Sequence, residues 1–222
     1  MGSSTRTGLP VQASQWQLVP VTVALIAVSF LGFFLVYYLG SPGVISLFTF
    51  LPFSLRGGEL AYSDMGWQYW RLLTPAFLHF GWLHIVFNSL WLWDLGSRLE
   101  LLLGRLNLLL LVVVIAVVAN VSQYYSTGPS LFGGMSGVVF GLLGFSWIAP
   151  LLQPAWRIQP PAAIMIFMVG WLLVCLFGVV EVLGFGAIAN GAHVGGLVCG
   201  ALLGIVFALL SRVGGPGAPS EV

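Results

Sequence analysis

The sequence predicts an all-α, polytopic membrane protein that crosses the bilayer with six transmembrane helices. Of its 222 residues 59% are hydrophobic and only 6% are charged, and the mean hydropathy is +1.04. Soluble domains carry roughly 25% charged residues. The apolar residues gather in runs close to the length of about 20 residues that a crossing helix needs. The net charge of +1 gives no indication of a nucleic-acid partner, so the lipid bilayer is the expected environment.

Six apolar segments are the predicted spans. They are residues 18–39, 83–99, 106–125, 136–150, 162–183 and 190–210. We expect a short cytoplasmic N-terminal tail at 1–17, one helical domain at 18–212 and a disordered C-terminal tail at 213–222, with no soluble domain outside the spans. No cleavable signal peptide is indicated, because the first run is long enough to span and no small-residue cleavage site follows it.

The arginines favour an orientation with both ends of the chain inside the cell. With the N-terminus inside, five arginines fall on inner segments and two on outer ones. The inner set is Arg6, Arg98, Arg105, Arg157 and Arg212, and the outer set is Arg56 and Arg71. Inner segments of membrane proteins carry the excess of basic residues. The second, fourth and sixth spans then begin at the outer face, which gives four polar residues a similar depth: His84, Asn88, Ser136 and His193.

The connection between the first two spans is about forty residues long and rich in aromatic residues, notably at 48–53 and 67–71. That is too long for a simple loop. Tryptophan and tyrosine favour the membrane interface. We therefore expect a partly embedded lateral element.

The fourth span is short for a membrane helix. From Ser136 to Pro150 it has about fifteen residues, or roughly 22 Å, against a hydrocarbon core of about 30 Å. We expect the preceding loop, residues 127–134, to dip into the membrane below a water-accessible hollow, because irregular backbone at that depth needs protein or water around it. The alternative is a helix that begins earlier, at Phe132.

The sixth span carries small residues at every fourth position. They are Ala192, Gly196, Gly200, Gly204 and Ala208, and the fourth span offers Gly137, Gly141 and Gly144. Small residues let two helix backbones approach closely. We interpret these glycines as structural and expect the two faces to pack, which would bring His193 towards Ser136.

Ser136 and His193 are the candidate nucleophile and base. A serine hydroxyl becomes a good nucleophile when an adjacent base takes its proton. Histidine within a span is costly and therefore indicates function. His84 and Asn88 lie four residues apart on one helix face, and both carry N–H donors for a developing oxyanion. Free backbone amides at the start of the fourth span add further donors. The sequence therefore predicts hydrolysis of an acyl bond.

Each candidate also has a plainer interpretation. A lone serine in a span usually bonds its own helix, and a lone histidine often bridges two helices. Three histidines could instead hold zinc, although His79 and His84 are five residues apart and no cysteine or carboxylate lies beside either. We expect no metal and no cofactor. Cys175 and Cys199 fall inside spans, where free thiols act as small hydrophobic groups.

The acidic residues Asp94 and Glu100 lie towards the inner end of the second span, far from the candidate site. We expect them to pair with Arg98 or Arg105, or to cap a helix, rather than to take part in catalysis. The serine–histidine dyad then lacks a carboxylate as a third member.

Four motifs together resemble the rhomboid intramembrane serine proteases, most closely the short bacterial six-helix type. They are Trp70-Arg71, His79-Phe80-Gly81-Trp82-Leu83-His84-Ile85-Val86-Phe87-Asn88, Gly133-Gly134-Met135-Ser136-Gly137 and Gly191-Ala192-His193-Val194-Gly195-Gly196. The resemblance covers residues 67–210, and the joint order, spacing and topology of the motifs make it specific. It implies a rhomboid-like six-helix bundle that crosses the bacterial cell membrane several times.

The resemblance implies a role for each candidate residue. Ser136 would be the nucleophile and His193 its base. His84 and Asn88 would help to form the oxyanion hole. Two further residues would be structural: Arg71 and Glu100. Family members cleave transmembrane helices near their ends, and their fifth helix and the loop after it act as a gate, here residues 162–183 and 184–189.

One departure concerns the residue one turn after the serine, where close bacterial members often have tyrosine and this chain has Phe140. We expect its ring to stack on His193 without supplying a hydroxyl. A second departure is length, since some relatives carry a soluble N-terminal domain.

Two rival classes stay open beside a protease that acts on transmembrane protein substrates. One is a non-catalytic rhomboid-like protein that binds transmembrane clients, although such relatives usually lack the serine or the histidine. The other is a transporter, for which neither a charged pathway nor an inverted repeat is evident. The sequence does not define an oligomeric state.

Overall fold

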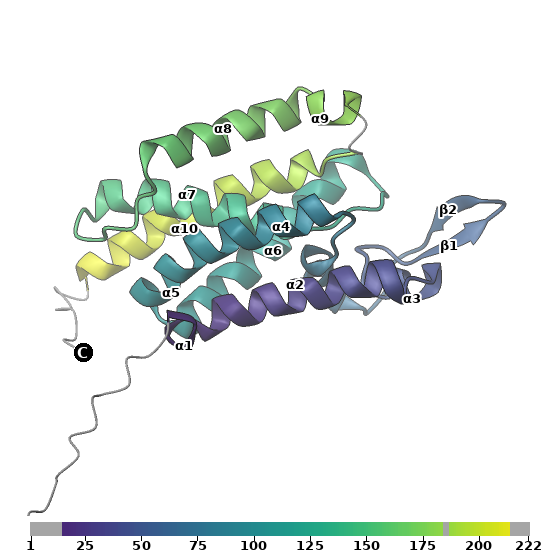
Figure 1. Cartoon of the computed structure of the whole chain (residues 1–222), viewed down its shortest axis with the longest axis horizontal. Helices are drawn as coiled ribbons and strands as arrows, with labels where there is room; N and C mark the ends of the chain where they lie inside the picture. Colours follow the sequence, from purple (N-terminus) through teal and green to yellow (C-terminus); the bar gives the residue numbers. More distant parts are fainter. Residues whose placement is uncertain (1–14, 184–186, 214–222) are drawn as a thin grey trace, which may run out of the picture.

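The computed structural model describes residues 15–183 and 187–213, and its long helices lie side by side along the longest axis of the molecule (Figure 1). In chain order the elements are α1 (Gln15–Leu18), α2 (Pro20–Tyr38), α3 (Pro42–Ser46), β1 (Phe53–Arg56), β2 (Glu59–Tyr62), η1 (Tyr69–Leu72), η2 (Thr74–Phe77), α4 (Trp82–Trp91), η3 (Leu92–Gly96), α5 (Ser97–Leu103), α6 (Arg105–Thr127), α7 (Ser136–Leu152), α8 (Ala162–Leu176), α9 (Val179–Val182) and α10 (Asn190–Val213). The disordered C-terminal tail and most of the N-terminal tail that we expected lie outside the described residues.

Among the described residues, three helices are long and apolar enough to cross a membrane. They are α2, α6 and α10, whose most apolar stretches have mean hydropathies of 2.2, 2.3 and 2.4. The helices α7 and α8 are shorter but also apolar. The expected helical membrane architecture is thus confirmed, although the described chain also holds the short strands β1 and β2, and the full number of six spans stays a prediction.

The fifth predicted span, 162–183, is wrong as a single helix. The helix α8 ends at Leu176, and the separate short helix α9 follows it. Between them Gly178 adopts a left-handed conformation with φ of 70°, which an α-helix cannot continue through. Part of the predicted gate loop, residues 184–186, lies outside the described residues.

The second predicted span is longer than residues 83–99. A continuous helical run extends from α4 through the π-helical segment η3 into α5 and ends at Leu103. Gly104, with φ of 80°, ends it and separates it from α6. Leu101, Leu102 and Leu103 continue the apolar run past residue 99, and the run stops only at Gly104 and Arg105.

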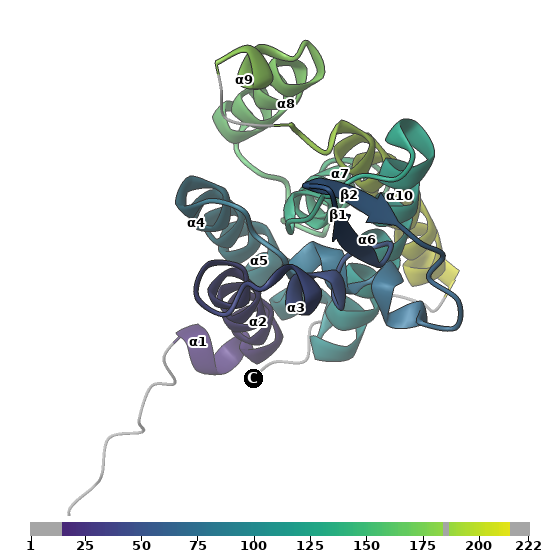
Figure 2. The ribbon, with the colours of Figure 1, turned by 90° about the vertical axis from the view of Figure 1, so that its right-hand side faces the viewer.

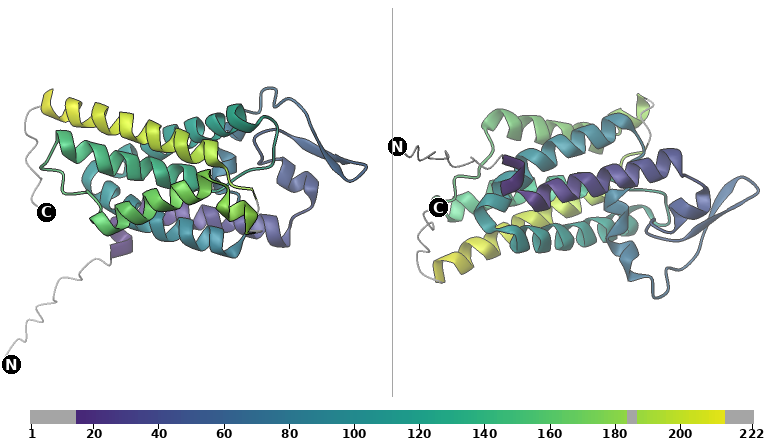
Figure 3. Two further views of the ribbon diagram at one scale, coloured as in Figure 1. Left: turned by 90° about the horizontal axis from the view of Figure 1, so that it is seen from above. Right: turned by 60° about the horizontal axis from the view of Figure 1, so that its bottom comes forward.

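The connection between α2 and α4 is a series of small elements rather than one lateral element. It holds α3, an antiparallel hairpin of β1 and β2, and the two short helices η1 and η2. The hairpin pairs Phe53 with Tyr62 and Arg56 with Glu59. It extends beyond the ends of the neighbouring helices in both Figure 1 and Figure 3. Its position relative to the membrane stays a prediction.

Arg71 holds this connection together. Its side chain is only 2% exposed. Its guanidinium donates to the carbonyl oxygens of Ser46 and Thr49, the latter at 2.9 Å, and to the side chain of Gln68 at 2.8 Å. The guanidinium therefore joins the end of α3 and the residues after it to the start of η1, which is the structural role that the resemblance implies for Arg71.

Glu100 caps the first long helix. Its carboxylate accepts hydrogen bonds from the backbone amides of Val21 and Thr22 at 2.9 and 2.8 Å, and from the hydroxyl of Thr22 at 2.8 Å. The first amides of a helix have no intrahelical partner, and a negative charge is favourable there. Asp94 instead forms an ion pair with Arg98 at 2.7 Å. Both acidic residues thus take the structural roles that we expected.

The helix α7 lies within the bundle beside α10 and α6 (Figure 2), and every residue from Gly137 to Ser146 is buried. The glycines allow this position. A Cβ atom at Gly196 would clash with the carbonyl oxygen of Gly137, and one at Gly200 with that of Gly141. The predicted packing of the two small faces is therefore confirmed as direct backbone contact.

We expect Gly200→Val to destabilise the fold, because the new side chain would meet the backbone of Gly141 on the facing helix. Overpacked cores typically lose about 1–3 kcal/mol. The midpoint of thermal unfolding in detergent measures the effect. Gly170→Val on α8 is the matched control, since a Cβ atom there meets nothing within 4 Å. An unchanged midpoint for Gly200→Val would contradict the contact.

Candidate active site

Ser136 and His193 are in direct contact between α7 and α10. The hydroxyl oxygen Oγ of Ser136, the first residue of α7, lies 2.8 Å from Nε2 of His193, the fourth residue of α10. His193 is only 5% exposed, whereas Ser136 is half-buried. The two residues are 57 positions apart in the sequence. The glycine contacts between the two helices bring them together.

The chain before Ser136 is not helical, so the alternative of a helix beginning at Phe132 is wrong. Gly134 has φ of 116°, which lies outside the helical range. Positive φ values of this kind favour glycine. Its amide donates to the carbonyl oxygen of Pro75 at 3.0 Å. The expected irregular loop ahead of a helix starting at Ser136 is thus confirmed, while its depth in the membrane and the water-filled hollow stay predictions.

His84 and Asn88 face this loop from α4. A Cβ atom on Gly134 would clash with the ring of His84 and would lie 3.6 Å from Nδ2 of Asn88. This Nδ2 atom is buried and has no hydrogen-bond partner within the described part of the chain. A buried donor without an acceptor is costly. The predicted pair of donors therefore lies beside the loop that ends at Ser136, and the NH₂ group of Asn88 is free for an acceptor that the described residues do not supply.

His79 supports the same loop, a role that the sequence did not reveal. Its Nδ1 atom lies 3.0 Å from the carbonyl oxygen of Phe77, and its Nε2 atom accepts from the amide of Met135 at 3.4 Å. A ring that donates through Nδ1 can accept through Nε2, so a neutral histidine satisfies both contacts. His79 is fully buried, with 0% exposure. Its place in the loop just before α4, five residues from His84, was the available signal.

Two amide side chains hold the start of α10, and the sequence analysis assigned neither. Gln123 on α6 accepts from the backbone amide of Ala192 at 3.2 Å. Asn190, the first residue of α10, donates to the carbonyl oxygen of Cys175 on α8 at 3.0 Å. Ala192, the residue before His193, is thus held by α6, and Asn190 at the start of the helix is held by α8.

The ring of Phe140 contacts His193 but does not stack on it in parallel. The ring centroids are 4.8 Å apart and the planes are inclined by 44°. The expected stacking of the Phe140 ring on His193 is therefore wrong, although the two rings are in contact. In this tilted arrangement Phe140 covers the imidazole without donating a hydrogen bond. The Nδ1 atom of His193 is buried and has no hydrogen-bond partner among the described residues.

The other histidines, His79 and His84, lie beside the loop before Ser136, whereas the two cysteines are buried in α8 and α10. Within residues 15–183 and 187–213, no group of three or more His, Cys, Asp or Glu residues could hold a metal ion. The rings of His79 and His84 are 5.0 Å apart and each contributes to the loop described above. Cys175 and Cys199 are free and buried, in α8 and α10 respectively.

The fold and the geometry define a class: a helical membrane protein in which a serine–histidine pair lies between two closely packed helices, beside buried N–H donors. The chain belongs to the rhomboid family, because residues 66–210 match the Rhomboid domain. This match includes every residue of the candidate site.

Several bacterial proteins that carry the name Rhomboid protease GlpG are similar to this chain. The chain is 36% identical to the protein of Pectobacterium atrosepticum over 184 residues, which cover 83% of this chain and 61% of that relative. It is 38% identical over 168 residues to the proteins of Yersinia pseudotuberculosis and Yersinia pestis, which covers 72% of this chain and 59% of each relative. The chain thus spans about three fifths of the length of the relatives that it matches.

Proposed function

We propose that this protein is an intramembrane serine endopeptidase that hydrolyses peptide bonds in or near transmembrane segments of other membrane proteins. The contact of 2.8 Å between Oγ of Ser136 and Nε2 of His193 carries this proposal. A base within hydrogen-bond reach of a hydroxyl is the geometry that activates serine as a nucleophile. The name Rhomboid protease GlpG of the relatives supports the same activity.

In the first half of the reaction, Oγ of Ser136 attacks the carbonyl carbon of the scissile bond while Nε2 of His193 takes the hydroxyl proton. The carbonyl oxygen becomes an oxyanion. The free N–H group of Asn88, the ring of His84 and the backbone amides at the start of α7 are the donors that would stabilise this charge. His193 then gives its proton to the departing amine, and the amine leaves an acyl group on Ser136.

In the second half, a water molecule replaces the amine. His193 accepts a proton from this water, whose oxygen attacks the acyl carbon. The proton returns to Oγ of Ser136 as the acyl–oxygen bond breaks, which releases the new carboxylate terminus. His193 performs every proton transfer in both halves without a third catalytic carboxylate. Its orientation comes from Phe140 and the fixed start of α10.

We further infer that six helical segments cross the membrane with both ends of the chain inside. Three of these segments are the long helices α2, α6 and α10. The other three are the helical run from α4 to α5, the helix α7 and the helix α8. The excess of arginines on the inner segments supports this orientation. It places Ser136 towards the outer face, and α8 is the helix beside which a transmembrane substrate would enter.

A fluorophosphonate probe tests this function directly. We expect the folded protein to become covalently labelled, with the added mass on the peptide that contains Ser136, because the probe reacts with activated serines. Ser130→Ala is the matched control: this serine lies in the same loop, bonded to Thr127 and Gly128, and its loss should leave labelling intact. Folded protein that stays unlabelled would support the client-binding alternative instead.

Asn88→Ala should lower the turnover number while leaving the Michaelis constant nearly unchanged, since its free N–H group would meet a charge that exists only in the transition state. Loss of one oxyanion donor costs about 10²–10³ in rate. Other donors remain, so we expect the lower end of this range. Steady-state kinetics on a transmembrane substrate in liposomes measures it, with Asn107→Ala on the exposed start of α6 as control. A preserved turnover number would make Asn88 a packing residue.

A further inference from the structure

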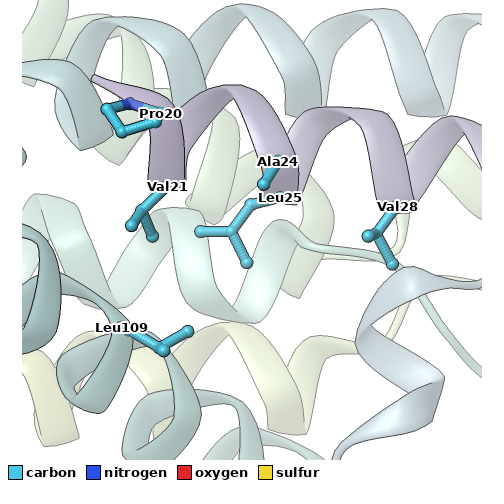
Figure 4. Close-up of a pocket in the computed structure, with 6 residues that line it drawn as sticks. All are labelled: Pro20, Val21, Ala24, Leu25, Val28 and Leu109. Atoms are coloured by element: carbon cyan, nitrogen blue, oxygen red, sulfur yellow. The ribbon is translucent and has the colours of Figure 1, made fainter. Parts of the chain in front are cut away.

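A groove of about 350 Å³ runs between α2 and α6 (Figure 4). In the ribbon of Figure 2, α2 lies on the side of the bundle away from α8. Its lining residues are Pro20, Val21, Ala24, Leu25, Val28 and Leu109. Five of them follow one another along a face of α2, and Leu109 closes the groove from α6. The side chain of Leu25 forms its floor, with 7% exposure, while Val28 and Leu109 are 43% and 42% exposed.

The walls of this groove suit hydrocarbon and not water. Every lining side chain is aliphatic, and both helices are among those long and apolar enough to cross a membrane. A hollow left empty there would forfeit the dispersion contacts of its lining atoms. Within a bilayer, a lipid acyl chain is the component that can fill it.

The positively charged side chain of Arg105 lies near one end of the groove. Arg105 is the first residue of α6 and lies four positions before Leu109, so both share a helix face about 6 Å apart along the axis. Pro20, the first residue of α2, lines the same groove, so the first turns of both helices lie at this end. Trp16, just before α2, is 67% exposed there, as is typical of a residue at the membrane interface.

The charge of Arg105 is not neutralised within the described residues. Its exposed side chain has no ion pair and no hydrogen bond there, since the one salt bridge joins Arg98 to Asp94. The other acidic side chain near this end, Glu100, is occupied by the backbone of α2. A phosphate group would supply the negative charge that Arg105 does not find among the described residues. Basic sites between membrane helices bind anionic lipid headgroups.

We propose that the groove between α2 and α6 is a binding site for an anionic phospholipid of the surrounding bilayer. One acyl chain lies along the face from Val21 to Val28, and the phosphate meets the guanidinium of Arg105 and the free amides at the start of α6. The proposal requires only that α2 and α6 lie in the membrane, so it does not depend on the proteolytic activity.

The test compares phosphatidylglycerol with phosphatidylcholine on the purified full chain, by counting bound lipids in native mass spectrometry. We expect one tightly held phosphatidylglycerol on the wild type. Arg105→Gln should reduce the preference for it over phosphatidylcholine about fivefold, which corresponds to ~1 kcal/mol for one arginine near a membrane surface. Ala24→Phe should expel both lipids by filling the groove. Val28→Trp, at a side chain that is 43% exposed, fills it with less risk to the fold.

Arg157→Gln is the matched control, because Arg157 is also exposed and unpaired in the described structure but lies in the connection between α7 and α8. It should keep the wild-type preference. An equal loss in Arg157→Gln would mean that net charge alone attracts the lipid. Retained binding in both groove-filling variants, or equal affinity of the wild type for the two lipids, would overturn the site.

Discussion

Purified Ser136→Ala is expected to lose all measurable cleavage of a transmembrane substrate while keeping the unfolding midpoint of the wild type. The substitution removes one hydroxyl, whose hydrogen bond in the structure goes to His193. Removal of the nucleophile in a serine protease costs on the order of 10⁶ in turnover number. The helix start is retained, because Ser136 does not cap α7 with its side chain.

The assay compares cleavage in liposomes by wild type, Ser136→Ala and the loop control Ser130→Ala, and measures thermal unfolding of all three. Only Ser136→Ala should be inactive, and all three should unfold at similar temperatures. Residual turnover by Ser136→Ala above a few parts per million would assign the nucleophile to another group. A large fall in its unfolding midpoint would mean that lost folding explains the lost activity.

His193→Ala should be almost as damaging, because no other described histidine contacts the hydroxyl of Ser136. His79 is held by Phe77 and Met135, and His84 faces Gly134. The effect on folding should be small but not zero, since the contact with Phe140 is also lost. His193→Gln, which preserves more of the side-chain volume, separates the two effects: it should recover stability and not activity.

The double variant Ser136→Ala/His193→Ala should be little slower than either single variant. Residues that act as one unit lose their function together, so their separate losses do not multiply. Single-turnover rates, with the uncatalysed rate as the baseline, measure this coupling. If the double variant were slower by the product of both single losses, the two residues would contribute independently, and a serine–histidine dyad would be the wrong description.

The helical fold was predictable from the sequence, because long apolar runs indicate helices that cross a membrane and regularly spaced small residues indicate close helix packing. The face from Ala192 to Ala208 on α10 indicated a close helix contact, and the structure supplies its partner in Gly137 and Gly141. The same contact explains why Ser136 and His193 could be paired from sequence. Their roles in catalysis stay predictions, but their proximity follows from helix packing.

The features that escaped prediction are local changes of the backbone and polar contacts between distant segments. The hairpin of β1 and β2 had a signal in Gly57-Gly58, a dipeptide typical of two-residue turns. Nothing local indicated that His79 would bond Met135, which is 56 residues away, or that Gln123 would bond Ala192 at a separation of 69. The break at Gly178 was hidden within an apolar run, where composition continues and only the backbone changes direction.

The backbone contact between α7 and α10 also determines how the site responds to its bilayer. Membranes differ in hydrocarbon thickness, and helices accommodate the mismatch by tilting. Where Gly196 and Gly200 touch the carbonyl groups of α7, no side-chain torsion can adjust, so the two helices must tilt as one rigid pair. The distance between Ser136 and His193 is then independent of bilayer thickness. We expect a thinner or thicker membrane to act instead on α8, the helix beside which we propose that a substrate enters.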